Sequence, residues 1–147
     1  MSRKKIAFII NPNSGNDKKT DRVKLIRRLV NNTYDSEIIL WENVEDCDAI
    51  FRRVISENFD VAVAVGGDGT VSQLATALCG TKVTLGIIPF GSGNGLARHL
   101  GIPMNPSKSM QLIENGQVQK IDRGKINNQS FFCTAGVGFD ARIGKLF

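Results

Sequence analysis

The sequence predicts a layered α/β domain with a mainly parallel sheet. Four short apolar runs alternate with segments of helical periodicity along the first 116 residues. Strands that helices cover on both faces read as continuous apolar runs, whereas half-exposed strands alternate apolar and polar residues. An Asn-Pro or glycine-rich segment follows three of the runs. Such segments are typical of the loops that leave the strands of an open parallel sheet.

The first half of the chain is expected to hold three strands and two helices. The strands are β-favouring runs without internal breakers. In the segments between them, apolar residues recur at i, i+3 or i+4, which is the spacing of one helix face. The expected order is strand 5–11, helix 18–30, strand 36–41, helix 46–57 and strand 60–65.

The second half continues the alternation. From Thr70 onward, apolar residues recur at i, i+3, i+4 and i+7, and Gly80 is placed to end this helix. A strand over 83–88, a short helix to about Leu100 and a helix over 106–116 follow. The pattern then changes, and two strands, 117–126 and 129–135, are expected to form a hairpin at Asn127-Asn128.

Composition limits the classes of function. The three cysteines, Cys47, Cys79 and Cys133, lack Cys-x-x-Cys spacing, which argues against a disulfide-stabilised secreted protein and for a reducing compartment. The longest apolar run, Ile6 to Ile10, is too short to span a bilayer. No signal-peptide pattern precedes it. We therefore expect a cytoplasmic protein.

The charge of the chain is unevenly distributed. Nineteen basic against 14 acidic residues give a net charge of +5, and nine of the basic residues lie within the first 30 positions. This surplus favours an anionic membrane surface or a phosphate-bearing ligand, although a solvated helix face explains it equally well. Aromatic residues do not interleave with it, so nucleic acid is not an expected partner. The nine residues are Arg3, Lys4, Lys5, Lys18, Lys19, Arg22, Lys24, Arg27 and Arg28.

Three loops follow strand ends, at residues 11–15, 66–70 and 89–95. In open α/β sheets, ligands bind in the crevice outside the carboxyl ends of the strands, so the three loops should face one site. Glycines allow the backbone amides to approach a ligand closely, and the amides at a helix N-terminus favour phosphate. A single glycine-rich loop is explained equally well as a simple tight turn. Two glycine-rich loops beside one crevice predict a binding site for a polyphosphate ligand.

Several standard motifs are excluded. The segment from Gly91 to Leu96 lacks the last glycine of the dinucleotide fingerprint, and the sequence contains no Gly-Lys-Ser/Thr. His99 has no ligand companions at zinc spacing, and Ser14 and Ser92 show no His-Asp partnership for acyl transfer. Asp68 lies between the glycines, where a carboxylate is costly unless it holds a metal ion or accepts a proton. Its structural alternative is to cap the helix that begins near Thr70.

Three motifs carry a family resemblance. They are Asn11-Pro12-Asn13-Ser14-Gly15, Gly66-Gly67-Asp68-Gly69-Thr70-Val71 and Pro89-Phe90-Gly91-Ser92-Gly93-Asn94-Gly95-Leu96-Ala97-Arg98. In this order and spacing they resemble the catalytic domain of the diacylglycerol kinase family, which includes sphingosine, ceramide and bacterial lipid kinases. The middle motif alone also resembles NAD kinases and phosphofructokinases. The first and third motifs favour the lipid kinases.

The resemblance implies a Rossmann-like layered domain that binds ATP, or another nucleoside triphosphate, together with Mg²⁺ and transfers the γ-phosphate to a lipid hydroxyl. With the basic surplus, it implies a cytoplasmic protein that contacts an anionic membrane peripherally, at the inner membrane surface. It implies that Asp68 is the catalytic residue and a metal ligand. Ser72-Gln73 and Trp41-Glu42 depart from the family pattern, so no role is assigned to them. The residues that match nucleotide-binding positions are Asn11, Ser14, Gly15, Gly66, Gly67, Gly69, Thr70, Gly91, Ser92, Gly93 and Asn94.

The segment from Asp122 to Ala141 resembles the first strands of the family's second, β-sandwich domain. Members of the family normally continue much further, which implies an N-terminal portion that is inactive alone. We therefore divide the chain into an α/β nucleotide-binding domain, 1–116, and the truncated start of a β-rich domain, 117–147. Open strand edges there invite homo-oligomers. The alternatives are an NAD kinase-like small-molecule kinase and a non-catalytic nucleotide-binding fragment.

Overall fold

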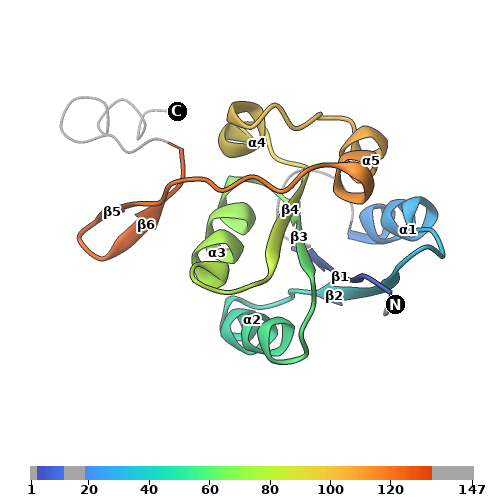
Figure 1. Cartoon of the computed structure of the whole chain (residues 1–147), viewed down its shortest axis with the longest axis horizontal. Helices are drawn as coiled ribbons and strands as arrows, with labels where there is room; N and C mark the ends of the chain where they lie inside the picture. The colour runs from blue at the N-terminus through green and yellow to red at the C-terminus, as the bar shows by residue number, and fades with distance from the viewer. Residues whose placement is uncertain (1–2, 12–18, 134–147) are drawn as a thin grey trace.

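The computed structural model describes residues 3–11 and 19–133. It confirms the α/β layered fold and the mainly parallel sheet (Figure 1). The strands of the sheet lie in the order β2-β1-β3-β4, and every neighbouring pair is parallel. They are β1 (Lys5–Ile10), β2 (Asp35–Leu40), β3 (Val61–Gly66) and β4 (Thr84–Pro89).

Helices cover both faces of the sheet, with α2 and α3 on one side and α1 and α5 on the other (Figure 1). None of the helices within the described ranges is both long enough and apolar enough to cross a bilayer. The helices are α1 (Lys19–Leu29), α2 (Cys47–Ser56) after a short 3₁₀ turn η1 (Val44–Asp46), α3 (Asp68–Leu78), α4 (Gly95–His99) and α5 (Pro106–Asn115).

Strand β1 explains why the predicted strands are continuous apolar runs. Its residues alternate between two cores, because successive side chains of a strand point to opposite faces. Phe8 packs in the core beneath α1 and α5, together with Ile26 and Met110. Ile9 packs in the core beneath α2 and α3. Both side chains are fully buried, so neither face of this strand tolerates a polar residue.

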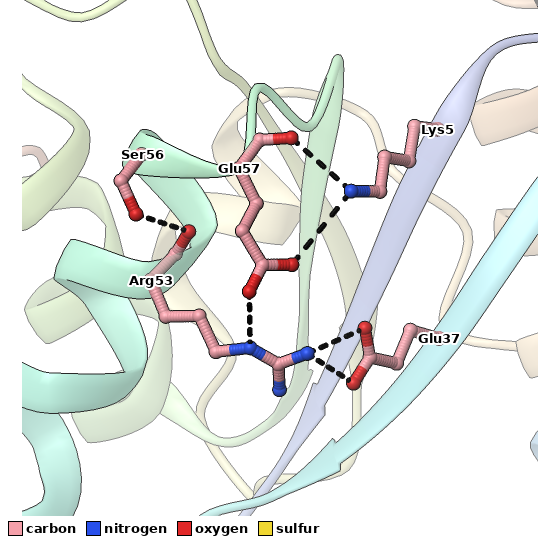
Figure 2. Close-up of polar contacts among 5 residues, drawn as sticks. All are labelled: Lys5, Glu37, Arg53, Ser56 and Glu57. Carbon is pink, nitrogen blue, oxygen red and sulfur yellow. Dashed lines mark hydrogen bonds and ion pairs between the residues drawn. The ribbon is translucent and has the colours of Figure 1, made fainter.

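An ion-pair network fixes the amino edge of the sheet, where β1 begins (Figure 2). Arg53 of α2 lies 2.8 Å from carboxylate oxygens of both Glu37 and Glu57. Lys5 donates to the Glu57 carbonyl oxygen at 3.1 Å and lies 3.7 Å from its carboxylate. The Arg53 guanidinium lowers the pKa of Glu57. Each exposed ion pair of this kind contributes little to the free energy of unfolding. Together, however, the pairs join α2 to β1 and β2 at the sheet edge opposite the predicted ligand-binding loops.

The C-terminal part of the described chain forms a separate hairpin of β5 (Gly124–Ile126) and β6 (Gln129–Phe131). Asn127 and Asn128 both have positive φ, 46° and 65°, which confirms the predicted turn. The predicted strand over 117–126 is wrong for its first seven residues, which are exposed and unpaired because β6 pairs with 124–126 alone. Residues 134–135 of the second predicted strand lie outside the described residues.

Candidate functional site

The sheet order brings the loops that follow β1, β3 and β4 to one edge. Strand β1 pairs with β2 on one side and with β3 on the other, so the direction of winding reverses between β1 and β3. Ile10 lies opposite Val65, and Gly66 lies opposite Pro89. Asn11, Gly67 and Phe90 therefore begin neighbouring loops at the carboxyl edge, where open α/β sheets bind ligands.

The second loop leads directly into helix α3. This helix begins at Asp68, two residues earlier than predicted, and Gly67 is its N-cap. Its first backbone hydrogen bond runs from the Val71 amide to the Gly67 carbonyl oxygen at 3.1 Å. The amides of Asp68, Gly69 and Thr70 precede this bond, and such first-turn amides take partners from outside the helix. Beyond its chain neighbours and the backbone of its own helix, no described atom lies within 4 Å of a Cβ placed on Gly69, so this turn is open to an approaching group.

Thr70 carries a buried hydroxyl beside these amides. The residue is 3% exposed, and its Oγ1 has no hydrogen-bond partner among the described residues. An unsatisfied buried hydroxyl is costly, and it is a place where an incoming ligand restores a hydrogen bond. The assignment of Thr70 to a phosphate site stays a prediction, and its unsatisfied hydroxyl is consistent with it.

The third loop is in backbone contact with the second. A Cβ on Gly91 would lie 2.7 Å from the Gly67 Cα, so any larger residue would force the two loops apart. The Asn94 side chain closes the third loop on itself, accepting from the Gly91 amide at 2.9 Å and donating to the Gly91 carbonyl oxygen at 2.6 Å. Asn94 is 7% exposed with a φ of 52°, a left-handed conformation that Asn tolerates well.

Asp68 connects the two loops through its carboxylate. Oδ2 accepts the Asn94 amide at 2.8 Å, and Oδ1 accepts the Gly95 amide at 2.6 Å. The structural alternative, that Asp68 caps its own helix, is wrong, because Gly67 is the N-cap of α3 and the Asp68 carboxylate instead accepts amides of the third loop and α4. Sequence reasoning missed these partners because they lie 26 and 27 residues away.

Asn11, at the carboxyl end of β1, is held by Arg22, whose buried position was not predicted from the sequence. Arg22 was expected among the basic surface residues, but it is 1% exposed. Its Nη1 donates to the Asn11 carbonyl oxygen at 3.2 Å, and its guanidinium lies 5.1 Å from the centre of the Phe90 ring. Arg22 precedes the buried Ile26 by four positions, so helical spacing could have identified it as core-facing.

The structure brings together most of the predicted site residues. Ser14 and Gly15 lie outside the described residues, and Asn11 lies at the edge of the described segment. The predicted site residues brought to one edge of the sheet are Asn11, Gly66, Gly67, Asp68, Gly69, Thr70, Gly91, Ser92, Gly93 and Asn94.

Gln73 and Trp41, from the two segments that depart from the family pattern, both contact residues of helix α2. Gln73 accepts a hydrogen bond from the Cys47 thiol at 3.3 Å, which joins α3 to α2. Burial, together with the nearby Asp48 carboxylate, raises the pKa of Cys47. Trp41 is 3% exposed and packs edge-on against Phe51 with ring centres 5.6 Å apart.

The described residues do not assemble a metal site by themselves. No group of three His, Cys, Asp or Glu side chains with metal-binding geometry lies within the described ranges. Both Asp68 oxygens already accept amides. Magnesium commonly binds through one or two carboxylates plus substrate phosphates. The assignment of Asp68 as a metal ligand therefore stays a prediction.

Comparison with known proteins gives consistent matches. The family model described as diacylglycerol kinase catalytic domain matches residues 5–126. Diacylglycerol kinases of Staphylococcus aureus, strains bovine RF122 / ET3-1 and JH9, are 32% identical to the chain over 139 residues, covering 92% of it. The crystal structure of a diacylglycerol kinase from Bacillus anthracis str. Sterne superposes with a TM-score of 0.77 at 28% identity, over 89% of this chain and 46% of that one. The chain spans 44% of the length of these curated relatives.

Proposed function

The chain belongs to the diacylglycerol kinase catalytic domain family, and we propose that it is the nucleotide-binding part of an ATP-dependent lipid kinase. The reaction would transfer the γ-phosphate of ATP to the hydroxyl of a diacylglycerol- or sphingosine-like lipid. The observation that carries the proposal is the junction of the glycine-rich loops. There, Gly67 and Gly91 touch beside an open helix N-terminus and an unsatisfied Thr70 hydroxyl.

The nucleotide phosphates fit the first turn of α3. The amides of Asp68, Gly69 and Thr70 have the donor chemistry that phosphate oxygens require, and the positive end of the helix dipole favours their charge. The Thr70 hydroxyl offers a further hydrogen bond to a phosphate oxygen. Gly69 provides the open approach. Gly66, Gly91, Ser92, Gly93 and Asn94 complete the proposed nucleotide-binding set on the described side, and Asn11, Ser14 and Gly15 belong to it by motif.

Asp68 is proposed as the catalytic carboxylate. As the lipid oxygen bonds to the γ-phosphorus and the bond to the bridging oxygen of ADP breaks, the hydroxyl proton would pass to Asp68. Each carboxylate oxygen has two acceptor positions, so an oxygen that holds an amide retains one for this proton. A bound Mg²⁺ would supply charge neutralisation on the phosphates, and no step here is routed through it.

The test is an assay of labelled ATP with separate lipid and NAD pools. It uses the protein from the full open reading frame that encodes this chain and, in parallel, the 147-residue chain itself. We expect label in lipid from the former, and nucleotide binding without transfer from the latter. Label in NADP instead would support an NAD kinase-like enzyme. Nucleotide binding with label in neither pool would reduce the protein to a non-catalytic nucleotide-binding module.

A further inference from the structure

The carboxylate of Asp68 points away from the helix that it begins and toward the helix that follows the third loop. Helix α4 starts at Gly95 after the N-cap Asn94, whose own side chain does not cap it. Its first amides are satisfied instead by Asp68 of α3, with Asn94 on Oδ2 at 2.8 Å and Gly95 on Oδ1 at 2.6 Å. A carboxylate that accepts two amides forms charge-assisted bonds, which are stronger than neutral ones.

The third loop is shaped to admit this carboxylate. A Cβ on Gly93 would lie 2.7 Å from Asp68 Oδ2, closer than a Cβ carbon approaches an atom to which it is not bonded. A Cβ on Gly95 would lie 3.7 Å from Oδ1, which is an ordinary contact. Gly93 is therefore the position in this loop where the absence of a side chain serves Asp68. Arg98 adds a further tie, since its Nε donates to the Gly93 carbonyl oxygen at 2.8 Å.

We infer that Asp68 is a positioning residue as well as the proposed catalytic group, because its carboxylate locks the third loop onto the first turn of α3. The lock fixes the distance between the amides that begin α3 and the loop of Gly91–Asn94. The expected effect on nucleotide affinity rests on the proposed function, whereas the contact between Asp68 and the third loop does not. A carboxylate that only accepted a proton would leave the affinity for nucleotide unchanged when it is neutralised.

The first variant is Asp68→Asn, which replaces one acceptor oxygen with an amide group that faces a backbone donor. The second is Gly93→Ala, which leaves the carboxylate intact but obstructs its approach. Each is expected to weaken binding of a non-hydrolysable ATP analogue about tenfold, the effect of losing roughly one such bond. The double variant should be little weaker than either single one, because both break the same contact.

Asp60→Asn is the matched control. Its Oδ2 also accepts a backbone amide, that of Lys5 at 2.7 Å, but at the opposite edge of the sheet. The analogue should bind this variant as it binds the parent. Additive losses in the double variant, or unchanged affinity in Asp68→Asn, would overturn the positioning role.

A second readout does not depend on function. In the ¹⁵N-labelled chain, the amides of Asn94 and Gly95, which Asp68 accepts at 2.8 and 2.6 Å, should be protected from hydrogen exchange, and Asp68→Asn should remove this protection. Amides whose exchange does not respond to Asp68→Asn would refute the lock even if nucleotide binds. Amides whose exchange responds in a chain that binds no nucleotide would support the lock and count against the proposed function.

Discussion

At the residue scale, two buried polar side chains tie the sheet edges and helices together over long sequence distances. Arg22 joins the end of β1 to the ring of Phe90 at the site. Tyr34, 5% exposed, joins the connection between α1 and β2 to α5, since its hydroxyl donates to Glu114 at 3.1 Å. The local sequence around each of these two residues does not indicate which residue it contacts. Such contacts therefore lie beyond prediction from periodicity alone.

Tyr34 predicts a loss of stability at high pH. Burial raises the pKa of Tyr34 from 10.0 to about 12, and the hydrogen bond to Glu114 adds to the shift. The raised pKa means that the folded state holds the proton more tightly than the unfolded state does. The associated stability is complete below about pH 10 and is lost as the pH rises toward about 12. The free energy of unfolding should fall by about 1 kcal/mol between about pH 8 and about pH 11.

The measurement compares urea unfolding of the parent and Tyr34→Phe at both pH values. The variant loses the Glu114 hydrogen bond at every pH, so it should be less stable at about pH 8 but lack the Tyr34 contribution to the alkaline slope. Lysines titrate in the same range in both proteins, and the difference between the two slopes removes their contribution. Equal slopes would show that Tyr34 ionises with equal ease in the folded and unfolded states.

At the element scale, the sequence predicted all four strands of the sheet and the helices between them, because burial on two faces leaves a strong local signal. β3 is buried at each of its six positions, and its run is apolar throughout. The signal fails where pairing decides the outcome. Residues 117–123 belong to a strand predicted from the sequence, but they have no strand partner among the described residues. For the site, the glycines and Thr70 were predictable from the motifs, whereas the partners of Asp68 depend on the meeting of two loops.

Helix α1 gives the prediction for membrane contact. Three basic residues of α1 are exposed and share one face at i, i+3 and i+4, namely Lys24, Arg27 and Arg28. Arg22 is buried and therefore does not belong to this basic surface. We propose that this face contacts an anionic membrane. Replacing the three residues with Gln should weaken binding to anionic vesicles by about 1 kcal/mol per engaged residue, and the loss should shrink at high salt.

A charge-matched control separates a specific face from net charge. Arg52, Lys82 and Lys108 are also exposed but lie outside α1, on α2, in the connection between α3 and β4, and on α5. Their replacement with Gln lowers the net charge equally and should leave vesicle binding close to that of the parent. Equal losses in both triple variants, or equal binding of the parent to neutral and anionic vesicles, would contradict a docking role for α1.

At the scale of the whole molecule, the described chain consists of a well-covered sheet and a poorly covered extension. The sheet has a buried core on each face. The hairpin β5–β6 reaches that core mainly through Phe132, which packs against the cluster beneath α2 and α3. Two-stranded hairpins are marginal alone. Division of the chain at residue 116 stays a prediction. The change from helices packed on the sheet to the exposed segment 117–123 occurs close to this residue.

The uncovered segment predicts self-association of the 147-residue chain. Val118 is 72% exposed, and Ile121 and Ile126 are each 41% exposed. The β5–β6 pair also presents strand edges that the described residues leave open. Apolar side chains beside open edges favour pairing with a second copy of the chain.

Sedimentation should show an apparent molecular mass that increases with protein concentration. The double variant Val118→Ser, Ile126→Ser should shift the chain toward the monomer without changing its helical circular dichroism. Leu112→Ser, at a 43% exposed apolar position on α5, should leave the association unchanged. A parent chain that stays monomeric over the whole concentration range would show that residues 117–126 are not an associating surface.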